Sequence, residues 1–353
     1  YNLATQGRRQ PGSSFKIIVL LAALDAGHSP NDSIDGSSPC TVKVPGFAPY
    51  TPGNYEGSAG SVMSLTEATA KSVNCAYVRL GAHIGLDKVV EMGVRLGIPE
   101  NKLEALPSIS LGSKEVTPLE MAAAYATIAN DGVYHAPRFV EKVVDRNNKV
   151  LFEGPDKGKR AFSAQVARMA IGPMRAVVER GTGTRARLPG RQAAGKTGTS
   201  QNYENAWFVG FTPQLSTAVW MGAPEGNVPM TRVPVCGRVT GGCIPSMIWN
   251  AYMSAALEGM PAVAFPLPNP KQIPKGKAIR DKYSIRRATT TSSTASGAVP
   301  PPDEANPEPP PETIPPAGPS TTAPTSPPST RPPATSTTTA PTTTTTTAPP
   351  ADQ

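Results

Sequence analysis

Hydrophobic residues are concentrated in one run of the chain that is apolar on nearly every side. The run 13–27 reads Ser-Ser-Phe-Lys-Ile-Ile-Val-Leu-Leu-Ala-Ala-Leu-Asp-Ala-Gly and follows a Pro-Gly pair. A helix that is hydrophobic all round is a buried one, and a glycine just past the last turn is a common stop. We therefore predict a central buried helix that begins near Ser13 and ends at Gly27.

Other stretches predict helices because they carry recognisable starts and stops. Ser64-Leu-Thr-Glu67 and Thr117-Pro-Leu-Glu120 are capping boxes, the second with proline at the first helical position. The pattern 86–96 is amphipathic and ends at a glycine. The predicted helices follow Ser64, cover 86–96 and 117–129, run over 163–179 with a kink at Gly172-Pro173, and close the fold over 246–257.

Strand patterns predict one hairpin and one meander. Segments 138–145 and 150–153 flank a polar turn, which is typical of a hairpin. Segments 192–200, 206–211 and 216–221 are joined by short turns and predict an antiparallel sheet with Trp207, Phe208, Phe211 and Trp220 in the core. Segment 29–63 is expected to be irregular and partly β. Helices before a meander and one helix after it predict an α/β fold of the α+β type, with the sheet between helical layers.

Composition divides the chain near Phe265. Residues 1–266 are expected to form one folded domain, and 267–353 a basic linker followed by a Pro/Thr/Ser-rich tail that cannot bury enough apolar surface to fold. The apolar run 17–26 is too short to span a membrane, and no signal peptide is recognisable. Because the chain does not begin with methionine, we expect it to be part of a longer protein.

Charge and cysteine content narrow the function classes. The net charge is +8, but no nucleic-acid-binding motif is present, so we interpret the basic residues as a solvated face and expect no nucleic-acid partner.

Cys236 and Cys243 flank a hairpin-like stretch and are either a disulfide, which we favour, or two free thiols. The disulfide would contribute about 2–3 kcal/mol and imply an oxidising compartment. Cys40 and Cys75 have no evident partners, and no Cys or His spacing suits a metal, so no metal or cofactor is expected.

Candidate chemistry lies at the start of the buried helix. Ser13 and Lys16 are one turn apart on the same face. The serine is placed where N–H groups are unpaired and the helix dipole is positive. Burial lowers the pKa of a lysine, so Lys16 can act as the base that activates Ser13. Ser-x-x-Lys alone is a weak signal that arises often by chance.

Two more motifs follow in order, Ser72-Val73-Asn74 and Lys196-Thr197-Gly198-Thr199, and the ordered trio resembles that of β-lactamases and penicillin-binding proteins. The segments that surround it are similar to class A bifunctional penicillin-binding proteins over residues 1–265. These segments are 9–16, 110–122, 180–184 and 206–213. The Pro/Thr-rich tail resembles that of actinobacterial, especially mycobacterial, members.

The resemblance implies a D,D-transpeptidase that cross-links peptidoglycan stem peptides and is inhibited covalently by β-lactams. It implies that Ser13 is the nucleophile, Lys16 its base, and Ser72 the relay of a proton to the leaving amine. Asn74 would hold Lys16 and the substrate amide, and Lys196 would keep the site positive. Thr197 and Thr199 would bind the terminal carboxylate, Gly198 would allow close approach of the strand, and the backbone N–H groups of Ser13 and Thr199 would form the oxyanion hole.

The resemblance also implies features of a larger protein. The family's transpeptidase domain opens with a strand pair before the nucleophile helix, which we expect to be missing here, together with a glycosyltransferase domain and a membrane anchor. We therefore expect a fragment less stable than the whole domain. The implied location is the extracytoplasmic face of the cell membrane, with cell-wall synthesis or hydrolysis proteins as partners and membrane contact only through the missing anchor.

Three rival functions remain open. A D,D-carboxypeptidase differs only in using water as the acceptor, and a β-lactam-sensing binding module would acylate without turnover. A β-lactamase is disfavoured because the Glu-x-x-Leu-Asn segment of the class A enzymes is absent between Ser72 and Lys196. Glu100 and Glu104 lie in that region but lack the pattern.

Overall fold

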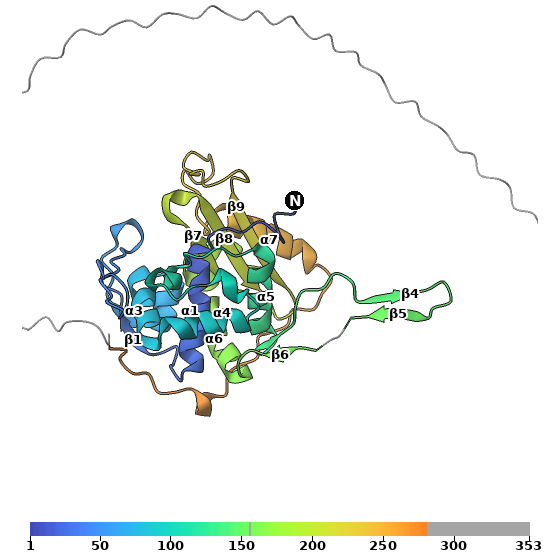
Figure 1. Cartoon of the computed structure of the whole chain (residues 1–353), viewed down its shortest axis with the longest axis horizontal. Coiled ribbons are helices and arrows are strands. Elements are labelled where there is room, and N and C mark those ends of the chain that lie inside the picture. Colours follow the sequence, from blue (N-terminus) through green and yellow to red (C-terminus); the bar gives the residue numbers. More distant parts are fainter. Residues whose placement is uncertain (155–156, 281–353) are drawn as a thin grey trace, which may run out of the picture. The chain divides into compact units, whose positions relative to one another are not determined.

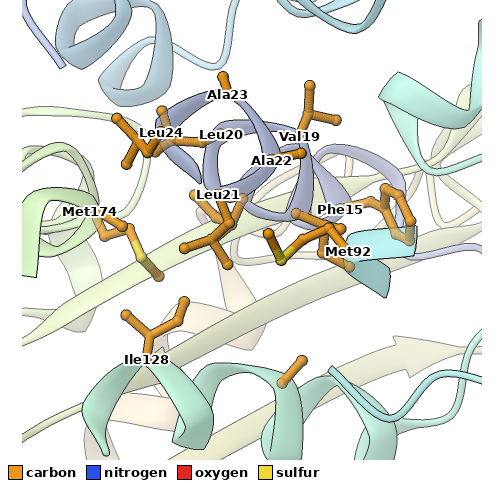
Figure 2. Close-up of a cluster of buried hydrophobic side chains, with 14 of the residues drawn as sticks. Phe15, Val19, Leu20, Leu21, Ala22, Ala23, Leu24, Met92, Ile128 and Met174 are labelled. Atoms are coloured by element: carbon orange, nitrogen blue, oxygen red, sulfur yellow. The ribbon is translucent and has the colours of Figure 1, made fainter. Parts of the chain in front are cut away.

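The computed structural model describes residues 1–154 and 157–280 of the chain. Helix α1 (Lys16–Asp25) lies at the centre of the hydrophobic core, and every residue from Lys16 to Leu24 is buried. Figure 2 shows side chains of three other helices, Met92, Ile128 and Met174, around those of α1. The predicted buried helix is confirmed, but its start differs: Ser13 lies in a preceding 3-10 turn, η1 (Gly12–Phe15).

The remaining helices begin close to where the capping signals placed them. The Ser64 hydroxyl accepts a hydrogen bond from the Glu67 N–H, and Thr117 and Glu120 form a complete capping box. The α-helices are α2 (Leu65–Ala70), α3 (Asn74–Ile84), α4 (Leu86–Arg95), α5 (Pro118–Ala129), α6 (Ala164–Arg180) and α7 (Ile244–Ala256). Short 3-10 turns are η2 (Tyr55–Gly57), η3 (Glu100–Lys102), η4 (Pro107–Leu111), η5 (Thr184–Ala186), η6 (Gln201–Tyr203) and η7 (Pro270–Gln272).

The predicted meander forms an antiparallel sheet of β7 (Ala194–Thr199), β8 (Asn205–Phe211) and β9 (Ser216–Gly222), with β8 in the middle. Side chains alternate across β8, which is buried at every position. Trp207, Val209 and Phe211 join the core around α1, whereas Phe208 joins a second core with Trp249 of α7. The sheet is therefore packed between helices on both faces, as Figure 1 shows.

Three two-stranded pairs complete the described structure. The predicted hairpin is confirmed as β4 (Lys142–Val144) with β5 (Val150–Glu153), and both strands are exposed along their length. The other pairs are β1 (Ser33–Asp35) with β2 (Val62–Ser64), and β3 (Val133–Tyr134) with β6 (Lys159–Arg160). None of the helices in the described ranges is long and apolar enough to cross a membrane.

Segment 267–280, which the composition assigned to the start of the linker, packs against β1. Ala278 forms a parallel bridge with Ser33, and the Lys277 N–H donates to Asp32 Oδ1 at 2.9 Å. Ile279 is 8% exposed and belongs to the main core. Backbone pairing and the apolar side chains of Ile273 and Ile279 thus hold a segment whose composition is basic. The Pro/Thr/Ser-rich tail, residues 281–353, lies outside the described residues.

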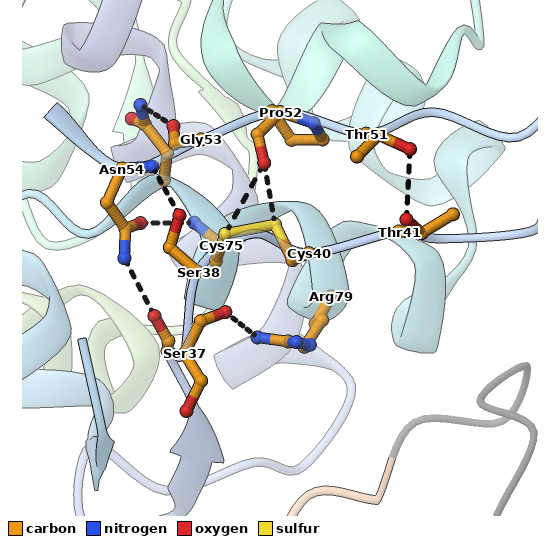
Figure 3. Close-up of a disulfide and its surroundings, with 12 residues drawn as sticks. Ser37, Ser38, Cys40, Thr41, Thr51, Pro52, Gly53, Asn54, Cys75 and Arg79 are labelled. Atoms are coloured by element: carbon orange, nitrogen blue, oxygen red, sulfur yellow. Dashed lines mark hydrogen bonds between the residues drawn. A yellow bond between two sulfur atoms is a disulfide. The ribbon is translucent and has the colours of Figure 1, made fainter. Parts of the chain in front are cut away.

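Two disulfides bridge loops around the sheet and helices. Cys236 and Cys243 are joined, which is the pairing favoured from their spacing. Cys40 and Cys75, for which no partner was evident in the sequence, are also joined, with their Cα atoms 5.6 Å apart (Figure 3). The Cys75 N–H, at the start of α3, donates to Asn54 Oδ1 at 3.0 Å. The irregular segment before β2 is therefore tied to the first turn of α3.

The two disulfides should differ in their contribution to stability. The Cys40–Cys75 bridge spans 35 residues and the Cys236–Cys243 bridge spans 7. Loop-closure entropy then predicts losses of about 4 and about 2.5 kcal/mol when each pair is replaced by alanine. Urea unfolding of the two double variants measures both free energies against the wild type. Equal losses, or a larger loss at Cys236–Cys243, would contradict the assignment of the longer loop as the main constraint.

Candidate active site

The turn that carries Ser13 is held by contacts between backbones. Gly12 has a φ of +53°, and a side chain there would clash with the Thr199 backbone of β7. A side chain at Gly198 would clash with the Pro11 carbonyl, and one at Gly112 with the Gly12 carbonyl. Gly12 and Gly198 therefore bring the η1 turn directly against strand β7, and Gly112 brings the end of η4 against the same turn, at positions where only glycine fits.

Buried aromatic residues fix the same turn through hydrogen bonds. The Trp207 Nε1–H of β8 donates to the Gln10 carbonyl at 2.8 Å, and the Tyr125 hydroxyl of α5 donates to the Ser14 carbonyl at 2.8 Å. Ser13, between these anchors, is partly exposed and lines two cavities. The position of the serine is thus determined by contacts with the core.

Two completely buried lysines surround a single hydroxyl, that of Ser72. The Lys16 Nζ donates to the Asn74 Oδ1 at 2.7 Å and to the Ser72 carbonyl at 2.6 Å, and lies 3.4 Å from the Ser72 Oγ. The Lys196 Nζ donates to the Ser72 Oγ at 2.7 Å and to the Thr197 carbonyl at 3.0 Å. All these partners are uncharged, and within the described ranges no acidic side chain forms an ion pair with either lysine.

Burial without a counterion favours the neutral form of an amine. Desolvation lowers the pKa of Lys16 well below its usual value, and the nearby charge of Lys196 lowers it further. Desolvation lowers the pKa of Lys196 to about 7. Burial therefore shifts Lys16, one helical turn from Ser13, toward the free amine that can accept a proton.

Ser72 occupies a strained backbone position between α2 and α3. Its φ is +59°, which is uncommon for a residue with a side chain. The Ser72 N–H donates to the Thr69 carbonyl at 3.1 Å, and its own carbonyl accepts from Lys16, so both backbone groups are satisfied. Backbone strain of this kind is found mainly at functional sites, where the surrounding contacts hold the residue in its unfavourable conformation. Here it places the Ser72 hydroxyl between the two lysines.

Hydroxyl groups continue the site along strand β7. The Thr197 and Thr182 hydroxyls are 2.7 Å apart, and Thr197 Oγ1 is 3.4 Å from the Lys196 Nζ. The Thr199 hydroxyl accepts from the Gly241 N–H at 3.2 Å. Threonine hydroxyls beside a buried amine form a polar, anion-accepting edge without a fixed negative charge.

Two cavities meet at Ser13, Asn74 and Thr199. The first cavity, of about 300 Å³, is lined by the catalytic candidate Ser72 and the substrate-binding candidate Thr197, and also by Tyr55, Lys71 and Thr240. The second cavity, of about 480 Å³, extends past Thr51, Ser113 and Gln201. Among the described residues, no acidic side chain lines either cavity. Ser13 can therefore be approached from two directions.

All the site residues that the three motifs predict lie close together in the structure. Ser13, Lys16, Ser72, Asn74, Lys196, Thr197, Gly198 and Thr199 lie in one region, although they come from η1, α1, the α2–α3 junction and β7. Sequence reasoning assigned no role to Thr182, Tyr55, Lys71 or Thr240. Thr182 lies in Arg-Gly-Thr-Gly-Thr, a segment already recognised as similar to the family, and that signal could have identified it. Across the described ranges, no His, Cys, Asp and Glu side chains group in a way that could hold a metal.

Comparisons with known proteins agree with this geometry. A family model described as "Penicillin binding protein transpeptidase domain" matches residues 1–225. Penicillin-binding protein 1A of Aquifex aeolicus is 34% identical over 268 residues, and the alignment covers 76% of this chain and 36% of that protein. Penicillin-binding protein 1A of Mycobacterium tuberculosis is also 34% identical, over 286 residues, with 74% and 34% covered. The chain thus spans about a third of the length of these relatives.

A solved structure is also similar. The PonA1 protein of Mycobacterium tuberculosis, in complex with penicillin V, superimposes with a TM-score of 0.69 at 32% sequence identity. The match covers 78% of this chain and 76% of that chain.

The lowered pKa of Lys196 predicts a pH dependence of stability. An unfolded lysine with a pKa near 10.5 holds a proton between about pH 7 and 10 that the folded protein does not hold. The unfolding free energy should therefore fall as the pH is lowered through this window, by at most about 1.4 kcal/mol per pH unit from this group. In Lys196→Met this contribution is absent.

Urea unfolding at pH 7, 8 and 9 measures the effect as the difference between wild type and Lys196→Met. Lys102→Met, which removes an exposed lysine, is the matched control and should follow the wild type. A difference between wild type and Lys196→Met that does not change with pH would show that Lys196 is protonated in the folded state.

Proposed function

The chain belongs to the penicillin-binding protein transpeptidase family, with the class A enzymes, and on this premise we propose that it is a serine D,D-transpeptidase that cross-links peptidoglycan stem peptides. The observation that carries the proposal is the position of Ser13. It lies three residues before the buried Lys16, whose pKa is lowered by burial, and at the junction of two cavities. One cavity accommodates the donor strand, and the other accommodates the group that is exchanged.

Acylation begins when Ser13 Oγ attacks the carbonyl carbon of the penultimate D-Ala. Lys16 accepts the proton of the Ser13 hydroxyl. The proton passes through Ser72, which lies between both lysines, to the amine of the terminal D-Ala, whose C–N bond breaks. D-Ala leaves, and an ester links the donor to Ser13. The amine of a second stem peptide then attacks this ester, and the proton transfers run in reverse.

Neighbouring groups bind and stabilise the reacting parts. Asn74 orients Lys16 and offers its amide to the donor, and the Thr197 and Thr199 hydroxyls bind the terminal carboxylate beside Lys196. The backbone N–H groups of Ser13 and Thr199 form the oxyanion hole, where each such donor is typically worth about 3 kcal/mol in the transition state. Gly12 and Gly198 support this assignment, because they allow the two backbones to approach closely.

The same geometry supports a role for each of the two cavities. Ser72 and Thr197 line the first cavity, so the leaving D-Ala lies there, and the donor strand extends from Ser13 into the second cavity. An acceptor amine must occupy the place of the leaving amine, which is also in the first cavity. A carboxypeptidase would need room there only for water. The first cavity, of about 300 Å³ and lined by the half-exposed Tyr55, offers more room than water needs, which supports transpeptidation.

A β-lactamase and a β-lactam sensor are less well supported than a transpeptidase. Glu104 pairs with Lys114, and neither it nor Glu100 lines either cavity, so among the described residues no carboxylate is placed to activate water for the rapid hydrolysis of a β-lactamase acyl-enzyme. A β-lactam sensor would need the same site without an acceptor path.

We further propose that β-lactams acylate Ser13, and that the protein acts at the extracytoplasmic face of the membrane with cell-wall proteins as partners. Two disulfides support an oxidising compartment.

Replacing Ser13 by alanine should abolish the reaction. With a donor peptide that ends in D-Ala–D-Ala and an amine acceptor, we expect Ser13→Ala to lower D-Ala release and cross-linked product by at least about a thousandfold, because the nucleophile is lost. Ser14→Ala is the matched control, since the Ser14 hydroxyl donates to the Pro11 carbonyl and lines neither cavity. Activity in Ser13→Ala equal to that of Ser14→Ala would refute the proposal.

Blocking the second cavity should affect long donors selectively. Thr51 lines that cavity and its hydroxyl bonds that of Thr41, which lines neither. We expect Thr51→Trp to lower kcat/KM for D-Ala release from a pentapeptide donor about tenfold and to change that of a short acyl-D-Ala–D-Ala donor little. Thr41→Trp breaks the same hydrogen bond and is the control. Equal effects of the two variants would contradict the assignment of the donor strand to the second cavity.

A further inference from the structure

A buried aromatic ring contacts the amine of Lys16, and no step of the proposed reaction uses it. Tyr77 of α3 is completely buried, and the Lys16 Nζ lies over its ring, 5.5 Å from the ring centre. A cation within about 6 Å of the centre of an aromatic ring is attracted by the negative face of that ring, most strongly where water is excluded. The contact therefore favours the charged form of the Lys16 amine.

The hydroxyl group of Tyr77 holds the ring in place. The Thr69 hydroxyl donates its one hydrogen to the Leu65 carbonyl at 2.6 Å. The Tyr77 hydroxyl lies 2.6 Å from Thr69 Oγ1 and is therefore the donor in the bond between them. Burial raises the pKa of the Tyr77 hydroxyl, so the ring carries no negative charge. Helix α2 thus fixes a neutral ring whose face is turned to Lys16.

The hydrogen-bond partners of Lys16 can be kept in both of its protonation states. The Ser72 carbonyl and the Asn74 Oδ1 accept from its Nζ at 2.6 and 2.7 Å. An ammonium has three hydrogens and a free amine has two, so both bonds survive when the third proton is lost. The attraction to the Tyr77 ring depends on the positive charge and is lost with that proton. The ring therefore distinguishes between the two states.

The other charged and titratable groups near Lys16 do not favour its ammonium form. Those that contact it, contact its neighbours or line the adjoining cavity are Lys196 of β7, Tyr77 of α3, Tyr125 of α5 and Lys71 after α2. In the part of the chain that the structure describes, no acidic side chain forms an ion pair with Lys16, and Glu67 pairs with Lys71 instead. Burial and the charge of Lys196 both lower the pKa of Lys16, and the Tyr77 ring opposes them.

The balance of these effects matters because Lys16 must accept a proton and later release it. A general base is most effective when its pKa lies near the pH at which the enzyme works. An amine whose pKa falls too far is free of its proton but takes one from a serine poorly. A carboxylate partner would have the opposite fault, because an ion pair would hold the proton on the lysine. An aromatic ring provides a smaller stabilisation of the ammonium.

We infer that the ring of Tyr77, held by Thr69, stabilises the ammonium form of Lys16 and thereby sets the pH above which Ser13 is activated. The inference rests on the proposed transpeptidase function, in which Lys16 accepts the proton of Ser13. Tyr77 lines neither cavity, so it does not touch the substrate. It is a positioning residue, and it acts on the reaction through Lys16 alone.

The test measures the rate of acylation of the full chain by benzylpenicillin as a function of pH. Position 77 carries phenylalanine or, by nonsense suppression, phenylalanine with one, two or three ring fluorines. Fluorine withdraws electrons from the face of the ring and changes its volume little, so the core stays filled. We expect the midpoint of the rising limb to fall with each fluorine, by about one pH unit in total, because the free amine of Lys16 then forms at lower pH.

Two further variants separate the ring from its hydroxyl group. Tyr77→Phe keeps the ring and removes the hydroxyl, whereas Thr69→Val removes the acceptor of that hydroxyl. Both should keep the wild-type midpoint, even where they lower the free energy of unfolding. A trifluorinated ring with the same midpoint as Tyr77→Phe overturns the inference. A shift in Thr69→Val as large as that of the trifluorinated ring also overturns it, because packing alone would then account for the effect.

The wild-type chain separates the failure of the inference from the failure of the proposed function. If benzylpenicillin acylates Ser13 and a D-Ala–D-Ala donor releases D-Ala, but fluorination leaves the midpoint unchanged, the inference is wrong and the proposed function stands. If the wild type is neither acylated nor able to release D-Ala, the proposed function fails and the inference fails with it.

Discussion

The fold brings two lysine amines into a fully buried site around one hydroxyl and surrounds them with uncharged oxygens. Lys16 and Lys196 are each 0% exposed, and Ser72 lies between them. Burying an unpaired ammonium is very unfavourable, so burial lowers the pKa of both lysines. The unfavourable burial of the lysine ammonium groups therefore has a chemical consequence, because an amine with a lowered pKa beside a serine can act as a base. The rest of the fold can be understood as the support that keeps these groups in place.

Four structural features provide that support. The buried helix α1 fixes Lys16, and the central strand β8, buried on both faces, holds β7 with Lys196. Glycine-mediated backbone contact brings the turn with Ser13 against β7. The Cys40–Cys75 disulfide ties a long irregular segment to the turn of α3 that presents Asn74. The penicillin-binding α/β fold thus joins parts of the chain that are almost two hundred residues apart into one rigid polar site.

The elements that were predicted correctly from the sequence are those with local signals. The apolar run of α1, the capping box of α5 and the short turns that join the strand segments around β8 each depend on residues close in sequence. The catalytic candidates were identifiable because the order of three motifs is informative even though each is weak. What sequence reasoning missed depends on contacts between distant segments: the Cys40–Cys75 bridge, the Thr182–Thr197 hydroxyl pair, and the packing of 267–280 on β1. The composition of 267–280 predicts a linker, but backbone pairing and the burial of Ile279 determine the structure of this segment.

The central claim is that Ser13 is a nucleophile activated by neutral Lys16. It is tested most directly by the rate of benzylpenicillin acylation as a function of pH, with the modified residue located by peptide mass mapping. The account predicts a single adduct on Ser13 and a rate that reaches its plateau well below pH 10.5, the usual pKa of lysine, because burial lowers the pKa of Lys16. An adduct on another residue, or a rate that still rises steeply near pH 10, would contradict it.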